Sequence, residues 1–190
     1  MKLKTQRLVI RELRKENLTD LVGQINNLNV SRNLEKVSYP YTNRDGEWFI
    51  DKCNEDAKKN PRENYKLKIE FEGKLVGLIG LTEVDNFHET ATLGYWLGEE
   101  YWRKGIMSEA SAEVVRFAFE DLGLRRIDVG ADVENEGSNA LIKKLGFEFE
   151  GTRKQYRKSM ATGEVHDRHI YGLLRENWKK LKQYIYKQTS

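Results

Sequence analysis

Residues 101–109, Tyr-Trp-Arg-Lys-Gly-Ile-Met-Ser-Glu, have the types and spacing of a phosphate-binding loop. They lie between an expected strand and a long expected helix, so free backbone N–H groups and the positive end of the helix meet there. Gly105 allows the backbone to approach a ligand closely, and Arg103 and Lys104 add positive charge. An ordinary helix start with a solvated Arg-Lys pair is the alternative. The loop lacks the Walker A and GxGxxG patterns, so it favours neither nucleotide hydrolysis nor NAD binding.

A second polar segment, at 135–147, follows the next expected strand. Asn135 is placed as the cap of a helix, and Ser138 points from the start of that helix toward whatever the first loop holds. Gly146 ends the helix. An ordinary capped helix would show the same pattern. The segment therefore indicates a binding site only in combination with the phosphate-binding loop.

The periodicity of apolar residues predicts the elements that must position these segments, with a period of two for strands and near 3.6 for helices. Three consecutive strands indicate an antiparallel meander, and the strand-helix-strand units after it indicate parallel pairing near the middle of the sheet. With no repeat and no linker, we expect one mixed α/β domain over 1–190. Strands are expected at 8–10, 65–71, 75–81, 90–97, 126–133, 147–157 and 165–174, and helices at 18–28, 42–59, 107–122, 138–145 and, as a basic C-terminal helix, about 176–190.

The composition excludes several classes of protein. With 38% hydrophobic and 33% charged residues and only 2 prolines, the 190-residue chain is globular rather than disordered. No apolar run reaches the ~20 residues of a membrane span, and no secretory signal is expected at the start. One cysteine, Cys53, excludes internal disulfides, and three histidines leave little material for a metal site. We therefore expect a cytoplasmic protein with no metal ion and no membrane partner.

Positive charge is concentrated near the C-terminus. The net charge is +3, but residues 151–190 hold ten Lys or Arg against three Asp or Glu. Such a tail indicates a nucleic acid or an anionic small ligand, and it fits a solvated lysine-rich helix equally well. Because the chain has no motif of interleaved aromatic and basic residues, we expect no direct contact with nucleic acid.

Several linked motifs occur in one order along the chain, and together they resemble the GNAT superfamily of acyl-CoA-dependent N-acetyltransferases. The resemblance is greatest to the RimJ/RimL-like group, which acetylates the N-termini of ribosomal proteins. Its specific parts are the runs at 93–110 and 135–147. The other motifs are Thr5–Arg11, similar to the family's T-x-R-L-x-[IL]-R opening, then Glu150-Gly151, and finally Gly163, Asp167, Tyr171 and Trp178 near the C-terminus.

The resemblance implies a GNAT-like fold, with a central, mostly antiparallel twisted sheet flanked by helices. Strands 90–97 and 126–133 would form a splayed parallel pair, and acetyl-CoA would lie as the cosubstrate in the wedge between them. The residues that the resemblance assigns to acetyl-CoA binding are Trp96, Leu97, Arg103, Lys104, Gly105, Ile106, Met107, Ser108, Asn135 and Asn139.

Three positions depart from the family's pattern. Arg103 stands where the phosphate loop usually has the first glycine of W-G-x-G, so its φ must be compatible with a side chain. Ile142 stands where many members have a tyrosine that acts as general acid, which isoleucine cannot do. The RimL-like group instead places a serine at the position of Ser138. Arg157 stands where some of that group have a carboxylate, which leaves the identity of the general base open.

Direct attack of an amine on a thioester needs a neutral amine, a polarised carbonyl and a protonated leaving thiol. Glu83, at the end of the strand before the central hairpin turn, is the first candidate for the general base, although an ordinary surface carboxylate would look the same. Asp85, His88 and bound water are the alternatives. Ser138 is the candidate hydrogen-bond donor to the thiolate. No covalent enzyme intermediate is needed, and we interpret Cys53 as a packing residue.

The expected function is transfer of an acetyl group from acetyl-CoA to a primary amine, with the N-terminal α-amine of a ribosomal-type protein as the favoured acceptor. An α-amine has a pKa of about 8 and needs less help from a base than a lysine or polyamine near 10.4. A polyamine or aminoglycoside N-acetyltransferase is the alternative within the family. A non-catalytic CoA- or RNA-binding module is the alternative from another class. A homodimer is left open.

Overall fold

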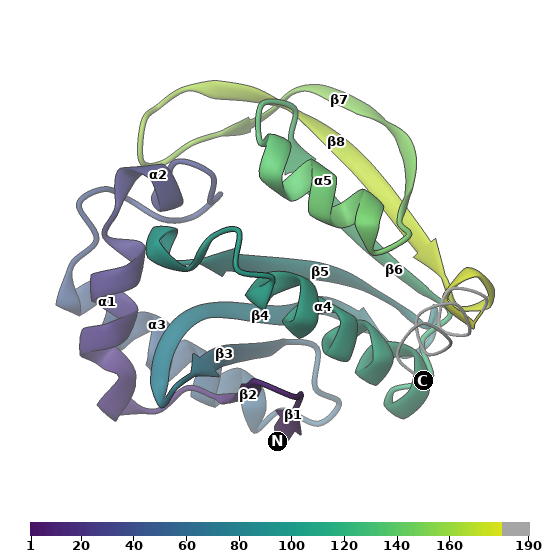
Figure 1. Cartoon of the computed structure of the whole chain (residues 1–190), viewed down its shortest axis with the longest axis horizontal. Coiled ribbons are helices and arrows are strands. Elements are labelled where there is room, and N and C mark those ends of the chain that lie inside the picture. The colour runs from purple at the N-terminus through teal and green to yellow at the C-terminus, as the bar shows by residue number, and fades with distance from the viewer. Residues whose placement is uncertain (180–190) are drawn as a thin grey trace.

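The computed structural model describes residues 1–179, in which strands and helices alternate in a mixed α/β order (Figure 1). The strands are β1 (Lys2–Lys4), β2 (Leu8–Glu12), β3 (Tyr65–Phe71), β4 (Lys74–Asp85), β5 (Thr90–Leu97), β6 (Arg126–Asp132), β7 (Glu148–Lys158) and β8 (Val165–Leu174). The helices are α1 (Leu18–Ile25), α2 (Leu28–Ser31), α3 (Asn43–Ala57), α4 (Ile106–Arg116) and α5 (Glu136–Lys144). Among the described residues, no helix is both long and apolar enough to cross a membrane.

The strands form one sheet in the order β1-β2-β3-β4-β5-β6-β8-β7. Every neighbouring pair is antiparallel except β5 and β6, which are parallel. In β3, Leu67 and Ile69 are buried on one face of the sheet. Lys68 points to the other face, where it is also buried and its ammonium pairs with the Glu70 carboxylate at 2.9 Å. The predicted meander and the predicted parallel pair are both confirmed.

Helices cover both faces of this sheet. In Figure 1, α4 and α5 lie in front of the sheet and α3 lies behind it. We call the apolar residues under α4 and α5 the main core. Behind the sheet, a second cluster joins α1 and α3 to β4 and includes Leu21, Ile50 and Leu78. Cys53 belongs to that cluster, and burial raises the pKa of its thiol to about 12, so its interpretation as a packing residue is confirmed.

The parallel strands β5 and β6 are paired over three positions only. Thr90, Ala91 and Thr92 lie opposite Arg126–Asp128, and no later residue of either strand is paired with the other. Beyond Thr92 and Asp128 the two strands separate, as Figure 1 shows for β5 and β6. The sheet therefore has an internal fork, with β5 on one side and β6 on the other.

Several boundaries differ from the sequence prediction for local reasons. The expected helix at 18–28 ends at Ile25, because Asn26 leaves the helix and its side chain accepts a hydrogen bond from the N–H of Tyr41. The expected helix at 107–122 stops being α-helical at Phe117, where a π-helical turn begins. Strand β1 was not predicted. The basic C-terminal helix begins at residue 175, and its part beyond residue 179 lies outside the described residues.

Candidate active site

The loop before α4 has the backbone geometry of an anion-binding site. The first intrahelical bond runs from the N–H of Glu109 to the carbonyl of Gly105, so the amides of residues 106–108 precede the hydrogen-bonded turns. Gly105 is the N-cap with a φ of +75°, and Arg103 has a φ of +59°. The latter conformation is open to a side chain at a cost of roughly 1–2 kcal/mol, so Arg103 keeps the turn of the glycine it replaces.

Only some of the predicted loop residues can use their side chains. Ile106 and Met107 are buried in the main core, so they can offer a ligand only their backbone amides. Ser108 is half-buried, whereas Arg103 and Lys104 are exposed. The arrangement places two basic side chains around a set of free N–H groups at a helix N-terminus, where the helix dipole favours negative charge.

A brace that sequence reasoning missed ties this loop to the N-terminal strands. The Glu109 carboxylate accepts hydrogen bonds from the Thr5 hydroxyl at 2.6 Å, the Arg7 backbone N–H at 2.9 Å and the Arg7 Nε at 2.7 Å. Arg7 also donates from its guanidinium to the Lys104 carbonyl at 3.2 Å. The signal was present in the sequence, because Thr5 and Arg7 are two of the polar residues of the opening motif.

The last residue of β5 has a backbone carbonyl that is already hydrogen-bonded within the protein. The Leu97 carbonyl accepts a hydrogen bond of 2.8 Å from the indole N–H of Trp102, so that carbonyl already has a protein partner. Leu97 itself packs in the main core, while Trp96 packs on the second cluster behind the sheet. Successive side chains of a strand point to opposite faces, so the two predicted residues flank the fork from different sides.

Ser138 lies at the start of α5 and faces β5. The Asn135 side chain accepts a 3.0 Å hydrogen bond from the Ser138 N–H, which confirms Asn135 as the predicted helix cap. The Ser138 hydroxyl is 2.8 Å from the hydroxyl of Tyr95 on β5. Burial raises the pKa of Tyr95 to about 12. The two hydroxyls thus meet across the fork.

Asn139 has little hydrogen-bonding capacity left for a ligand. Its side-chain NH₂ donates to the carbonyls of Asp132 and Asn135, each at 2.9 Å. Its side-chain oxygen accepts from the Tyr171 hydroxyl at 2.7 Å. Asn139 therefore secures the loop between β6 and α5. The neighbouring Ile142 is completely buried in the main core, where it cannot serve as an acid.

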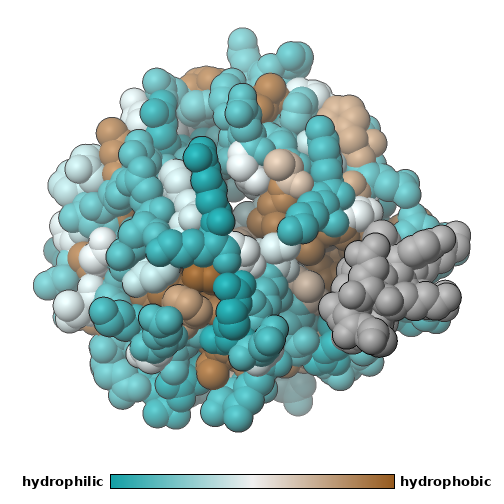
Figure 2. Space-filling model, in the orientation of Figure 1, coloured by the Kyte–Doolittle hydropathy of each residue, from teal (hydrophilic) through white to brown (hydrophobic). Residues whose placement is uncertain are grey.

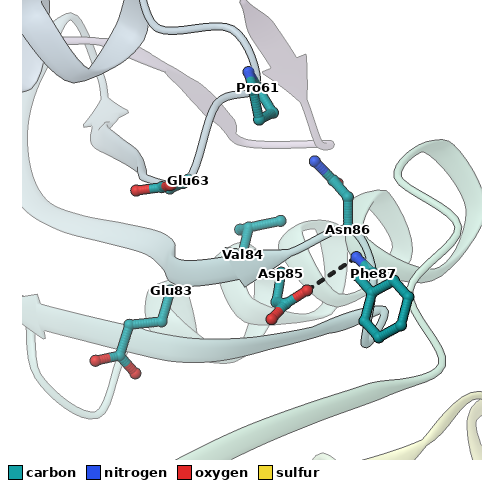
Figure 3. A pocket seen from close by; sticks show the side chains of 7 residues that line it. All are labelled: Pro61, Glu63, Glu83, Val84, Asp85, Asn86 and Phe87. Carbon is teal, nitrogen blue, oxygen red and sulfur yellow. Dashed lines mark hydrogen bonds between the residues drawn. The ribbon is translucent and has the colours of Figure 1, made fainter.

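Glu83 lies on β4 beside Thr92, the residue of β5 at which the fork begins. The ladder between β4 and β5 is irregular from Thr82 to Asp85, and Glu83 has a φ of +54° in that bulge. Its carboxylate accepts a 3.2 Å hydrogen bond from Thr92, the last residue of β5 that is paired with β6. Figure 3 shows this carboxylate pointing away from Val84, on the opposite side of the strand.

The alternative bases occupy the turn beyond Glu83. The Asp85 carboxylate accepts hydrogen bonds of 2.8 Å from the backbone N–H groups of His88 and Phe87. These bonds lower the pKa of Asp85, that from His88 contributing most, so this carboxylate holds the turn and is a weak base. The His88 carbonyl accepts from the Arg125 side chain at 2.8 Å, which ties the turn to the start of β6.

Arg157, which stands where a carboxylate was considered, forms a buried ion pair with Asp132 at the open end of β6. The same guanidinium donates to the carbonyls of Arg32 and Leu34, each at 3.0 Å. Both side chains of the pair are almost fully buried. Arg157 therefore joins β6, β7 and the segment after α2 at one point.

Comparison with known proteins agrees with this geometry. Residues 7–148 match the acetyltransferase (GNAT) domain, and the chain belongs to this family. It is 35% identical over 57% of its length to the "Putative ribosomal N-acetyltransferase YdaF" of Bacillus subtilis, of which the match covers 58%. It is 33% identical over 44% of its length to the ribosomal-protein-serine acetyltransferase of Escherichia coli, of which 47% is covered. The chain thus spans about half the length of these curated relatives.

The fold is shared with solved structures as well. One is RimL, a ribosomal L7/L12 α-N-protein acetyltransferase in complex with coenzyme A. It superposes with a TM-score of 0.79 at 20% sequence identity, covering 92% of this chain and 98% of that one. At this identity the likeness shows the fold, and it confirms the expected mixed sheet with one parallel pair.

Proposed function

We propose that this chain transfers an acetyl group from acetyl-CoA to the N-terminal α-amine of a protein, in the cytoplasm. The observation that carries this proposal is the fork between β5 and β6, with the free backbone amides of the α4 N-terminus at its open end. A slender ligand that ends in a pyrophosphate fits such a site, because free amides hold the anion while strand edges and core side chains line its arm. The CoA bound to RimL, which has the same fold, supports acetyl-CoA as the donor.

The two candidate catalytic side chains, Ser138 and Glu83, contact β5 from opposite faces. Tyr95 and its partner Ser138 are on the α4 and α5 face, where Tyr95 packs against the main core. Thr92 and its partner Glu83 are on the other face, which Trp96 shares. An amine that arrives from the Glu83 face would meet a thioester held in the fork, and the leaving sulfur would lie toward Ser138.

Each residue then has one task. Glu83 removes one proton from the acceptor ammonium, directly or through water, and the neutral amine then attacks the thioester carbonyl. The new C–N bond forms as the C–S bond breaks, and the second proton that the nitrogen loses passes through water to the sulfur. Ser138 donates a hydrogen bond to the sulfur, which carries the released electron pair. An α-amine with a pKa of about 8 is partly neutral at pH 7, so an exposed carboxylate suffices as the base.

The carboxylates of β6 favour an acceptor with one amine over a polycation. Asp132 is neutralised by Arg157. Arg126 contacts both Asp128 and Glu150, and its hydrogen bonds lower the pKa of Glu150. A polyamine needs several unpaired carboxylates, and those of β6 already have basic partners. The names of the two ribosomal-type relatives support the same class of acceptor.

A panel of acceptors tests the proposal. Release of free thiol from acetyl-CoA is followed with a peptide that has a free N-terminus and no lysine, the same peptide with a blocked N-terminus, spermidine, and an aminoglycoside. We expect turnover with the free peptide and none with the blocked one. Faster turnover with spermidine or the aminoglycoside would overturn the proposed peptide acceptor and make that amine the substrate class. If acetyl-CoA binds and no amine is acetylated, the chain is a CoA-binding module.

A further inference from the structure

The contact between Tyr95 and Ser138 joins two elements that are otherwise separated by the fork. Tyr95 is on β5, beyond the last position paired with β6, and Ser138 is in the first turn of α5. Their hydroxyl oxygens are 2.8 Å apart, and either can be the donor. The Tyr95 ring packs against the main core, so its hydroxyl is held by a rigid group.

Ser138 lacks an orienting partner of its own within α5. Its backbone N–H is bound by Asn135, but a serine hydroxyl rotates among three staggered positions and can turn back to a carbonyl of its own helix. The bond with Tyr95 selects the position that faces β5. This selection matters for catalysis, because a donor to a developing charge is effective only when its geometry is fixed in advance.

The count of protons shows what the pair can give. Two hydroxyls carry two protons, and the bond between them uses one. If Tyr95 donates to Ser138, the Ser138 proton is free for an outside acceptor, and the bond from Tyr95 makes that proton a stronger donor. Burial raises the pKa of Tyr95 to about 12, so Tyr95 keeps its proton throughout the neutral range.

We propose that Tyr95 is a positioning residue of the acetyl transfer, which donates its hydroxyl proton to Ser138 so that Ser138 points its own proton at the sulfur of CoA. The inference rests on the proposed function and deepens it. Neither proton leaves its oxygen. When the C–S bond breaks, the electron pair goes to sulfur, and the two hydroxyls stabilise the thiolate as a chain of hydrogen bonds.

The pair could instead serve only to fasten α5 to β5. Both roles predict that Tyr95→Phe weakens the structure, so stability alone does not separate them. They differ in the pKa of the CoA thiol when CoA is bound. A hydrogen-bonding pair that stabilises the thiolate lowers that pKa below the value in water, and a mere fastening leaves it unchanged.

The experiment follows the ultraviolet absorbance of the thiolate of bound CoA against pH. We expect wild-type protein to lower the thiol pKa by about one unit, with most of that shift lost in Tyr95→Phe and in Ser138→Ala. In turnover with the acceptor peptide, Tyr95→Phe should reduce kcat ~10- to 100-fold and change the KM for acetyl-CoA less than about threefold. Because the two residues act as a unit, the double variant should be no slower than Ser138→Ala.

Tyr65→Phe is the matched control, since Tyr65 is a partly buried tyrosine that packs against the same core and its ring contacts Phe117. It should leave both the thiol pKa and kcat unchanged. Wild-type protein that binds CoA without lowering its thiol pKa would overturn the role of Tyr95 and leave the proposed function standing. Wild-type kcat in Tyr95→Phe would do the same. Wild-type protein that binds no CoA would overturn the proposed function, and the role of Tyr95 with it.

Discussion

The carboxylate of Glu109 and the guanidinium of Arg7 are joined by a 2.7 Å hydrogen bond, although 102 positions separate the two residues in the sequence. Glu109 is in the first turn of α4, and Arg7 immediately precedes β2. Because Arg7 also bonds the carbonyl of Lys104, the N-terminal strands support the candidate phosphate-binding loop from outside. The start of the chain is thus part of the mechanical support of the site.

Removing the charge of Glu109 should loosen the loop while leaving the chemistry intact. We expect Glu109→Gln to raise the dissociation constant of acetyl-CoA ~10-fold, because bonds to a charged group contribute about 1.5–3 kcal/mol each to local stability. Titration calorimetry measures the change. Glu113→Gln is the control, since Glu113 is on the same helix and its carboxylate bonds Arg116 there. Equal losses of affinity in both variants would show a general effect on α4.

The contribution of the Glu109 carboxylate to stability should depend on pH. Burial alone would raise the pKa of Glu109, but the hydrogen bonds from Thr5 and Arg7 outweigh it and lower the pKa from its usual value of 4.5. A depressed pKa contributes stability above the unfolded-state value, and that stability is lost as pH falls through the folded-state value. The difference in Tm between wild type and Glu109→Gln should therefore be full at pH 6 and shrink below pH ~4.5. A difference that is constant down to pH 3 would contradict this assignment.

A negative side chain at Gly105 should abolish binding of the donor. Gly105→Asp adds strain at a φ of +75° and puts a carboxylate among the free amides. We expect calorimetry to show the loss of acetyl-CoA affinity in a protein that still folds. Gly73→Asp matches it for strain, because Gly73 has a φ of +78° and its added Cβ would meet no atom within 4 Å. Unchanged affinity in Gly105→Asp would place the donor elsewhere.

Replacing the candidate base should produce a loss that depends on pH. With Glu83→Gln, the rate of peptide acetylation should fall most near pH 7 and recover toward pH 9, where the α-amine is already neutral. Glu63→Gln is the control, because Glu63 lines the same hollow as Glu83 (Figure 3). A loss that is independent of pH would make Glu83 a positioning residue. No loss would leave Asp85, His88 or water as the base.

Breaking the buried pair of Arg157 and Asp132 should destabilise the fold. Arg157→Met removes the buried partner of the Asp132 carboxylate and leaves only the Arg168 guanidinium, whose Nη1 is 3.7 Å away, so we expect a cost of about 3–5 kcal/mol. The double variant with Asp132→Leu should lose less than the sum of the two single variants, because no lone charge remains. Urea denaturation measures each free energy of unfolding. Single-variant losses below about 1 kcal/mol would show that water reaches the pair and that it contributes little.

The sequence predicted the architecture well, because the apolar periodicity of β3 to β6 and the cap at Asn135 are local signals. It could not predict which polar groups meet across the fold. Tyr95 stood within a recognised motif, but only the meeting of β5 and α5 shows that its hydroxyl reaches Ser138. The resemblance assigns Asn139 to the ligand, whereas its side chain bonds the Asp132 carbonyl at the end of β6 and the Tyr171 hydroxyl of β8.

Unusual backbone conformations were the second kind of feature that the sequence could not predict. Arg103 shows a left-handed φ that the residue type disfavours, and the loop imposes it because the chain must turn into α4. Glu83 is likewise positioned by a bulge in β4, and the residue types of that segment do not predict the bulge. Such features depend on tertiary context, so they become visible only once the sheet is assembled.

The fork in the sheet has a consequence for solubility. A strand edge with unpaired N–H and C=O groups normally invites pairing with another chain, and the fork creates two such edges inside one sheet. In Figure 1, α5 lies over β6, the strand on one side of the fork. The hydrogen bond between Tyr95 and Ser138 ties α5 to β5 across the fork, so a foreign strand would have to break this contact to pair with either edge. The same arrangement that would admit a substrate arm therefore also protects the protein against edge-to-edge aggregation.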